Sequence, residues 1–297
     1  MNKSRKAMIT IAGGNGFIGQ AFQRFFKERG LAFFVLSRKE TDYTRPEELE
    51  KALKKIRPDF LINAAGFTGR PNVDGCEDHK AECLMANAVL PGIIGKVCQD
   101  LGLPWGHVSS GCIYSGRRPD GGGFREEDPP NFCFRQGPCS FYSGSKALGE
   151  EVLRDFPNVF IWRVRMPFSH IDGPRNYLGK LLRYDRLLDA ENSLSRLEDF
   201  VKAAHACWER RLPFGTYHLT NPGSVTTRQI TGLIRRHNLS SKEFRFFSGE
   251  DEFMTTAVRA PRSNCVLDTS KIERAGLPMP EIHTALESAL AQWQPST

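Results

Sequence analysis

Two short segments carry side chains whose types and spacing suit acid–base chemistry. Tyr142 and Lys146 are four residues apart, so on a helix they lie one turn apart on the same face. The ammonium would favour the phenolate, lowering the pKa of the phenol and making it a proton donor and acceptor near neutral pH. Ser110 and Cys112 are two positions apart and would point to one side of a strand end. A hydroxyl and a phenol can polarise a ketone and a thiol can move a proton on the adjacent carbon, so the segments predict ketone reduction with room for epimerisation.

A glycine-rich turn near the N-terminus lies between a predicted strand and a predicted helix. The apolar run 8–12 indicates a buried strand, and apolar residues from 17 onward keep a helical period. Glycines in this context allow a tight turn and the close approach of a pyrophosphate to a helix N-terminus. A structural turn without a ligand is the alternative. We predict a dinucleotide site that includes Gly13, Asn15, Gly16, Phe17, Ile18 and Gly19.

The residues after the second predicted strand, 32–36, bear on the choice of cofactor. An NAD site usually has an acidic residue here, but this chain has Ser37, Arg38 and Lys39. A hydroxyl and two cations suit a 2′-phosphate, so NADP(H) is the expected cofactor, unless the cations are only solvated surface charges. Asp42 is a candidate adenine contact.

Strands and helices alternate over the first 167 residues. Further strands are expected at 60–63, 105–109 and 159–165, and helices from Pro46, over 77–101 and over 141–156. This alternation predicts an α/β, Rossmann-like, doubly wound parallel sheet, with ligands beyond the carboxyl ends of the strands, where Asn63 and Ser110 fall.

Beyond Pro167 the pattern loosens. Helices are expected near 176–189, 195–211, 226–238 and 269–274, with short extended pieces at 216–220 and 244–247. We therefore expect an NADP(H)-binding domain over 1–167 and a smaller, mainly substrate-binding part over 168–297 that is interleaved with the main fold.

Composition excludes several classes of protein. The 297 residues are 40% hydrophobic and 25% charged, as in globular domains, and the formal net charge of +7 is dispersed, which argues against a nucleic-acid site. No apolar run approaches the roughly 20 residues of a membrane span. The eight cysteines have no metal-site spacing, so we expect reduced thiols, no metal centre and a cytoplasmic location.

Several strings resemble known families. The glycine loop, Asn63-Ala64-Ala65-Gly66 and the Tyr142–Lys146 spacing resemble an extended short-chain dehydrogenase/reductase. The strings 42–44, 57–59 and 262–268 are similar to dTDP-4-dehydrorhamnose reductases. The strings 68–74, 111–114 and 163–167 resemble bifunctional UDP-4-keto-6-deoxyglucose 3,5-epimerase/4-reductases, including the C-terminal half of plant rhamnose synthases. The resemblance extends from Met8 to about residue 289.

This resemblance implies roles for individual residues. Tyr142 would protonate the C4 oxygen during hydride transfer, with Lys146 on the cofactor ribose and Ser110 on the carbonyl. Cys112, which also matches a cysteine of GDP-fucose synthases, and Lys180 would exchange the C3 and C5 protons. The further cofactor contacts implied are Asn63, Ala64, Ala65, Gly66, Asn87 and Met166, and the substrate contacts are Thr68, Arg70, Asn72, Asn176, Arg262 and Asn264.

The expected activity is conversion of UDP-4-keto-6-deoxyglucose, supplied by a separate 4,6-dehydratase, to UDP-L-rhamnose. We also expect a homodimer formed through the helix of Tyr142 and the preceding region. A dTDP-4-dehydrorhamnose reductase without epimerase activity is one alternative, and a non-catalytic NADP-binding regulatory subunit is another. The sequence does not distinguish UDP-, dTDP- and GDP-linked sugars.

Overall fold

Six parallel strands form the central sheet of the computed structural model, which describes residues 7–296. They are β1 (Met8–Ala12), β2 (Ala32–Leu36), β3 (Phe60–Asn63), β4 (Trp105–Ser110), β5 (Val159–Val164) and β8 (Gly215–His218). Their order is β2-β1-β3-β4-β5-β8, so the direction of winding reverses between β1 and β3. The predicted α/β class with a parallel sheet is confirmed, and ligands of such sheets bind at the carboxyl edge beside this reversal.

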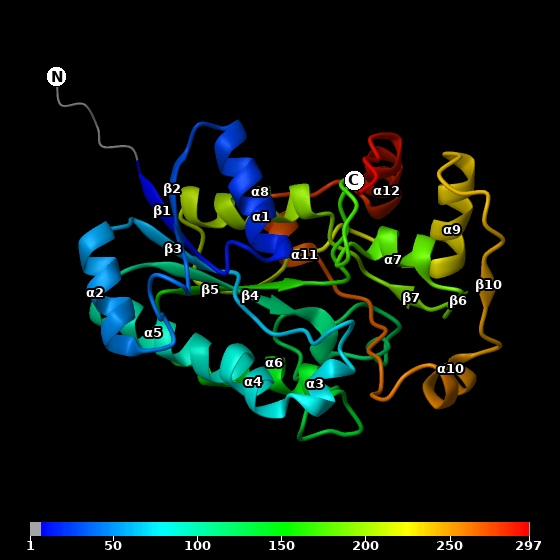
Figure 1. Cartoon of the computed structure of the whole chain (residues 1–297), viewed down its shortest axis with the longest axis horizontal. Helices are drawn as coiled ribbons and strands as arrows, with labels where there is room; N and C mark the ends of the chain where they lie inside the picture. The colour runs from blue at the N-terminus through cyan, green and yellow to red at the C-terminus, as the bar shows by residue number, and fades with distance from the viewer. Residues whose placement is uncertain (1–6, 297) are drawn as a thin grey trace.

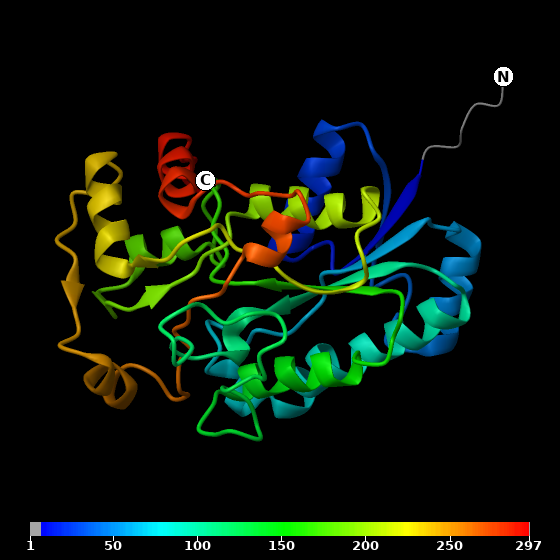
Figure 2. The same cartoon turned by 180° about the vertical axis from the view of Figure 1, so that it is seen from behind.

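Helices cover both faces of the sheet. Figures 1 and 2 show α1 (Phe17–Glu28) and α8 (Leu197–Glu209) on one face, and α2 (Pro46–Ile56), α5 (Leu90–Asp100) and α6 (Phe141–Val152) on the other. Phe22 and Phe26 of α1 pack with Phe200 of α8 and Trp162 of β5. Every residue of β4 and β5 is therefore buried, including the polar His107, Ser109, Ser110 and Arg163.

The helical region before β4 has four segments. They are α3 (Gly75–Asp78), α4 (Lys80–Leu84), the π-helical turn η1 (Met85–Val89) and α5, in which Pro91 lies in the first turn. The expectation that no apolar run approaches a membrane span is wrong by length and composition, since the run Lys80–Asp100 has a mean hydropathy of 1.3 and is long and apolar enough to cross a membrane on those two measures. Half of that stretch is buried inside the fold, as in a core helix.

The C-terminal part lies beyond the carboxyl ends of the strands (Figure 1). Helix α7 (Tyr177–Arg183) ends at Arg183 rather than at 189 as predicted, because the chain then extends into β6 (Arg186–Leu187), which pairs with β10 (Arg245–Phe246). The sequence did not reveal α10 or α12. Helices α8 and α11 and strand β8 return to the main sheet. The boundary between the two expected parts, at residue 167, stays a prediction. This part contains α7 (Tyr177–Arg183), β6 (Arg186–Leu187), β7 (Glu191–Asn192), β9 (Val225–Thr226), α9 (Thr227–Arg236), β10 (Arg245–Phe246), α10 (Glu250–Thr256), α11 (Ser270–Arg274) and α12 (Ile282–Ala291).

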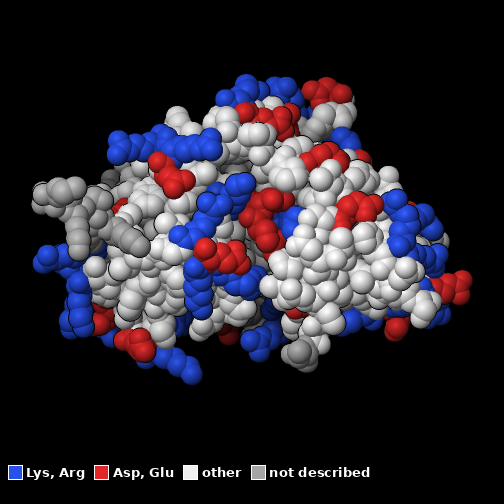
Figure 3. All heavy atoms as spheres, turned by 90° about the horizontal axis from the view of Figure 1, so that it is seen from above, with Lys and Arg blue, Asp and Glu red and all other residues white. Residues whose placement is uncertain are grey.

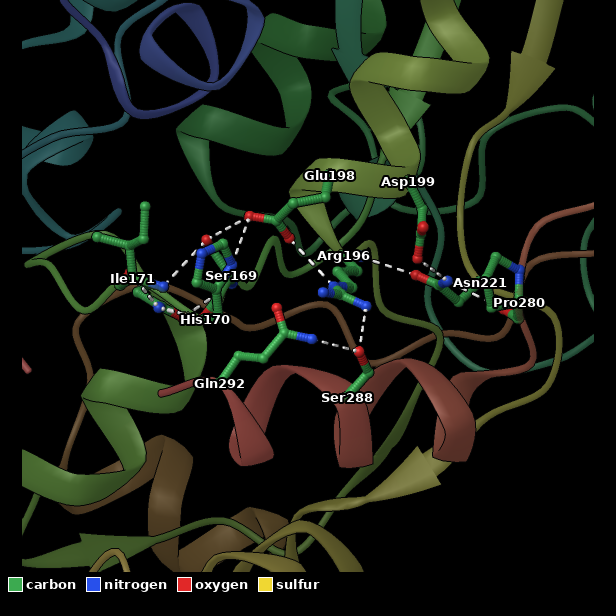
Figure 4. A network of polar contacts seen from close by, with 11 residues as sticks. Ser169, His170, Ile171, Arg196, Glu198, Asp199, Asn221, Pro280, Ser288 and Gln292 are labelled. Carbon is green, nitrogen blue, oxygen red and sulfur yellow. Dashed lines mark hydrogen bonds and ion pairs between the residues drawn. The ribbon is translucent and has the colours of Figure 1, made fainter. Parts of the chain in front are cut away.

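A polar network ties α12 to α8 (Figure 4). Arg196 Nη1 donates to Ser288 Oγ at 2.9 Å, and Arg196 Nε lies 3.2 Å from Glu198 Oε2. Ser169 Oγ donates to the other Glu198 oxygen at 2.6 Å. The network therefore links the segment after β5 to α12 as well as to α8.

The surface charges are mixed rather than gathered. On the face in Figure 3, lysine and arginine side chains are interspersed with carboxylates. Exposed ion pairs also occur among the described residues, such as Arg228–Asp189, with 3.0 Å between Nε and Oδ2. Exposed pairs of this kind add little stability.

Gly106 lets β4 pass beneath Trp162. A Cβ at this position would lie 2.0 Å from the indole ring, which is fully buried. We expect Gly106→Ala to lower the free energy of unfolding by about 1–3 kcal/mol, because a packed ring has no room to move. Urea unfolding measures this change. Gly232→Ala is the matched control, since that exposed helical glycine has no neighbour within 4 Å, and it should gain about 0.5–1 kcal/mol. Equal effects of the two changes would contradict the packing argument.

Candidate active site

The end of β4 fixes Ser110 and Cys112 relative to each other. Ser110 is the N-cap of η2, the short 3₁₀ turn Gly111–Ile113, and its Oγ accepts a hydrogen bond from Cys112 N at 3.2 Å. Both side chains are buried. The predicted pairing of a hydroxyl with a thiol at this strand end is therefore present in the structure.

Helix α6 brings Tyr142 and Lys146 to the same place. Its N-cap is Ser140, whose Oγ accepts from Ser143 N at 3.1 Å. Lys146 Nζ donates to the carbonyl of Val108 at 3.0 Å, two residues before Ser110. The ring of Tyr142 packs against the apolar cluster that contains Cys112. Ser110, Tyr142 and Lys146 thus converge at the carboxyl end of β4.

The pKa of Tyr142 departs from the expectation. Burial raises it above its ordinary value, and a hydrogen bond with Ser110 opposes only part of that shift. The predicted lowering of this pKa is not seen, because the enclosed phenol loses more hydration than the hydrogen bond with Ser110 compensates. Burial also lowers the pKa of Lys146 and raises that of Cys112. A neutral phenol is the form that can donate a proton.

The glycine turn has the properties of an anion site. Gly13 has a φ of 77°, and a Cβ on it would lie 2.3 Å from Ala65 N. Gly19 is equally close to the turn, since its Cβ would lie 2.3 Å from Gly13 O. Helix α1 begins at an exposed Gly16 with no side-chain cap and no acidic residue in its first turn. Its first N–H groups therefore suit a pyrophosphate, and Phe17 and Ile18 anchor the helix in the core.

The flanking cofactor candidates lie around this turn. Ala64 and Ala65 contact Gly13, and the exposed Gly66 follows them, where a Cβ would lie 3.7 Å from Lys146 Nζ. Arg38 is exposed after β2, and its charge acts on the neighbouring Asp42, which accepts a hydrogen bond from Thr44 N at 3.2 Å. The exposed Asn15 and the half-buried Met166, which has a φ of 37° just after β5, complete the set. The residues present fit NADP(H), with Arg38 placed for a 2′-phosphate.

Two predicted cofactor ligands act instead as internal braces. Asn63 is buried, and its Nδ2 lies 3.0 Å from His107 Nδ1. Its Oδ1 accepts a hydrogen bond from Ala65 N at 3.1 Å. Asn87 Nδ2 donates to Phe67 O at 2.8 Å and to Ser145 Oγ at 3.0 Å. These side chains shape the loop after β3 and join it to α6, because buried amides need partners.

Lys180 lies in a group of cations on α7. It is half-buried, and burial lowers its pKa to about 8, with further contributions from the charges of Arg175, Arg262 and Arg183. Arg175, which the sequence argument passed over, donates to Gly69 O at 2.6 Å and so joins α7 to the loop 68–74. A lysine with this pKa exchanges its proton near neutral pH.

The other substrate candidates are placed unevenly. Arg262 is held by Asp74 in a two-point contact, with both N–O distances 2.8 Å, so its guanidinium serves the loop 68–74 rather than standing free for a diphosphate. Asn72 Oδ1 accepts from Asp74 N at 2.8 Å. Asn264 lies 3.2 Å from Asn192, while Thr68 is half-buried and Arg70 is exposed.

Asn176 is not placed to contact substrate. It is fully buried and is the N-cap of α7. Its amide nitrogen donates to Ser169 O and Ile171 O, both at 2.8 Å, and its oxygen accepts from Leu178 N at 3.1 Å. The predicted ligand role is wrong because these bonds use the whole amide.

The sequence argument also missed two side chains that act on Cys112. A hydrogen bond from Ser143 and the charge of Arg165 both lower the pKa of the thiol against the effect of burial. Arg165 is buried and its Nε has no partner among the described residues. A signal was available, since Arg163 lies within the otherwise apolar strand β5 and Arg165 directly follows it.

Known proteins resemble this chain over nearly its whole length. A bifunctional dTDP-4-dehydrorhamnose 3,5-epimerase/dTDP-4-dehydrorhamnose reductase of Arabidopsis thaliana is 34% identical over 285 residues, covering 94% of this chain and 90% of that protein. A trifunctional UDP-glucose 4,6-dehydratase/UDP-4-keto-6-deoxy-D-glucose 3,5-epimerase/UDP-4-keto-L-rhamnose-reductase of the same plant is also 34% identical. This chain spans only 40% of that longer relative.

Solved structures share the fold. The L780 UDP-rhamnose synthase of Acanthamoeba polyphaga mimivirus has a TM-score of 0.89 at 24% identity, with 97% of this chain and 100% of that chain covered. A dTDP-4-dehydrorhamnose reductase of Bacillus anthracis in complex with NADP, the cofactor predicted above, has a TM-score of 0.79 at 21% identity and covers 96% of this chain and 98% of its own. The RmlD substrate binding domain matches residues 7–294, and with the plant relatives this shows that the chain belongs to the RmlD family.

Proposed function

We propose that this protein is an NADPH-dependent reductase of the 4-keto group of a UDP- or dTDP-linked 4-keto-rhamnose. The convergence of Ser110, Tyr142 and Lys146 at the end of β4 carries the proposal. The reductase names of the plant relatives support it. A separate 4,6-dehydratase would supply the precursor. A purely regulatory role is less favoured, because the complete acid–base set lies beside the glycine turn.

Each catalytic side chain has one task in this proposal. Bound NADPH supplies the hydride. Ser110 donates a hydrogen bond to the ketone oxygen, and the neutral Tyr142 transfers its proton to that oxygen as negative charge develops there. Lys146, held by the Val108 carbonyl, stabilises the phenolate that results.

Tyr142→Phe tests this assignment. We expect kcat for NADPH oxidation with dTDP-4-keto-L-rhamnose or UDP-4-keto-L-rhamnose to fall about 10²–10⁴-fold, because the proton donor is lost while the ring packing remains. NADPH affinity, followed by fluorescence, should stay within about threefold of wild type, since the phenol is not needed to bind the phosphates. Wild-type protein that oxidises no NADPH with either sugar would contradict the function. Full activity of the variant would contradict the role of Tyr142.

A second activity, 3,5-epimerisation of the same sugar, is supported by the bifunctional plant relative and by the resemblance that assigns Cys112 and Lys180 to proton exchange. Burial lowers the pKa of Lys180 to about 8 and raises the pKa of Cys112, so the amine suits proton removal and the thiol suits proton return. In our proposal Lys180 takes a proton from C3 or C5, the charge moves to the C4 oxygen beside Ser110 and Tyr142, and the Cys112 thiol returns a proton from the other face. The bifunctional plant relative has a similar length.

Exchange of the C3 and C5 protons with deuterated solvent tests this second activity. We expect exchange to rise with pH through about 8, because Lys180 must lose its proton to act as a base. Lys180→Met should abolish exchange, whereas Cys112→Ala should abolish inversion at the carbon while exchange through Lys180 continues, and both variants should leave NADPH binding intact. The surface variant Lys202→Met is the control. Exchange that is absent from wild type would leave a reductase alone.

We also propose a homodimer formed through the outer face of η1 and α6. Met85, Val89, Leu148 and Val152 are between 37% and 46% exposed on these adjacent segments. This face belongs partly to the helical run of mean hydropathy 1.3, which is more apolar than a solvated helix requires. A second copy would present the same face, so the two patches would cover each other.

Light scattering on a size-exclusion column tests the dimer. We expect wild-type protein to elute with twice the mass of the chain, and the double variant Val89→Glu/Val152→Glu to elute as a monomer, because buried carboxylates oppose an apolar interface. Phe34→Glu, at a residue 42% exposed on β2, should not change the mass. A wild-type monomer would overturn the proposal.

A further inference from the structure

A buried carboxylate–guanidinium pair joins α6 to β5, one helical turn beyond Lys146. Glu150 lies on α6 and Arg163 on β5, with side chains 9% and 5% exposed. Arg163 Nη2 is 2.7 Å from Glu150 Oε2, and its Nε lies 3.0 and 3.1 Å from the two carboxylate oxygens. Neither charge has much access to water, so each requires the other.

The remaining donor of the guanidinium is satisfied as well. Arg163 Nη1 contacts Tyr114 Oη at 2.9 Å, Glu126 O at 3.2 Å and His218 Nε2 at 3.0 Å. Because arginine only donates, His218 Nε2 accepts, and its Nδ1–H donates to Asp268 O at 3.0 Å. Burial and the charge of Arg163 lower the pKa of His218, which keeps this ring neutral. The pair therefore has a fixed geometry.

Glu150 connects this pair to the end of β4. Ser109, the neighbour of Ser110, donates its hydroxyl to Glu150 Oε1. One turn earlier on α6, Lys146 holds the carbonyl of Val108 at 3.0 Å. Residues 142, 146 and 150 follow one another at single-turn spacing. Two consecutive residues of β4, Val108 and Ser109, thus form hydrogen bonds with two consecutive turns of α6. Ser110 is the next residue of the strand.

We propose that Glu150 is a positioning residue for the reduction: it holds α6 against β4 and β5 so that Tyr142, Lys146 and Ser110 keep the geometry needed for proton transfer. The inference rests on the proposed reductase function. It assigns a task to a residue that does not itself touch the substrate.

The charge of Glu150 also acts on Lys146. Burial lowers the pKa of Lys146, and the charges of Cys112, Glu150 and Cys83 oppose that lowering. His107 also faces the ammonium, with its own pKa lowered by burial. Removing the negative charge of Glu150 would therefore lower the pKa of Lys146 further, and the ammonium would lose its proton at a lower pH.

Glu150→Gln separates a positioning role from a merely structural one. The amide keeps the size of the side chain but loses its charge and one acceptor. We expect kcat for the 4-keto sugar to fall about 100-fold, as for a displacement of catalytic groups of about 1 Å, with KM within about threefold of wild type. The alkaline limb of the kcat–pH profile should move to lower pH.

Glu151→Gln is the matched control. The neighbouring Glu151 also pairs with an arginine, Arg135, at 2.7 Å, but Arg135 is 76% exposed. This variant should match wild type in kcat and pH profile. Glu150→Asp, which keeps the charge but shortens the reach, should retain the alkaline limb of wild type and still lose kcat. Ser109→Ala leaves the ion pair intact and should also lower kcat, so the test survives if Glu150→Gln fails to fold.

Two outcomes overturn the inference. One is a Glu150→Gln protein that melts at a lower temperature but keeps the kcat and pH profile of wild type. The other is a Ser109→Ala protein of full activity. If wild-type protein reduces neither sugar, the proposed function fails separately. In that case NADPH affinity is measured between about pH 6 and about pH 10 in wild type and in Glu150→Gln, and its fall at high pH follows the loss of the Lys146 proton. If this fall occurs at the same pH in both proteins, the inference is contradicted.

Discussion

The attachment of α6 to the last residues of β4 is the interaction on which the candidate site depends. Lys146 holds the Val108 carbonyl, and Glu150 accepts the Ser109 hydroxyl while it pairs with Arg163 of β5. Strand β4 lies in the middle of the sheet and is buried along its whole length. The end of β4 therefore has little freedom to move, which fixes the positions of Ser110 and Tyr142. Proton transfer over a short distance requires such fixed positions.

Burial shifts the pKa values of Tyr142, Cys112 and Lys180 toward the neutral form of each group. The same removal of water that raises the pKa of Tyr142 and Cys112 lowers the pKa of Lys180 to about 8. In each case the neutral form is favoured, so a phenol and a thiol hold protons while an amine readily gives its proton up. The spacing of Tyr142 and Lys146 suggested an activated phenol, but the enclosure of the ring raises the pKa of the phenol instead.

Several polar residues near the site work as supports rather than ligands. Asn63, Asn87 and Asn176 use their amides on backbone and side-chain partners, and Arg262 is engaged by Asp74. Resemblance to a family can mark such residues as belonging to the site, but it does not say whether they face a ligand or brace a loop. A buried amide must have partners inside the protein, and the fold decides where those partners are.

The local features of this protein follow from short stretches of its sequence. Apolar stretches predicted β1, β2 and β3, the glycines at 13, 16 and 19 predicted the turn before α1, and the interval between Tyr142 and Lys146 placed both on one helical face. Predictions from the sequence were less accurate beyond Pro167. Helix α7 ends early there because the following residues pair with the distant strand β10, and α10 and α12 were not predicted. The contacts between groups far apart in the chain, such as Glu150 with Ser109 and Lys180 with the charge of Arg262, were visible only in the folded molecule. Those contacts depend on packing between elements and on the exclusion of water, and neither is encoded in the period of a short stretch of chain.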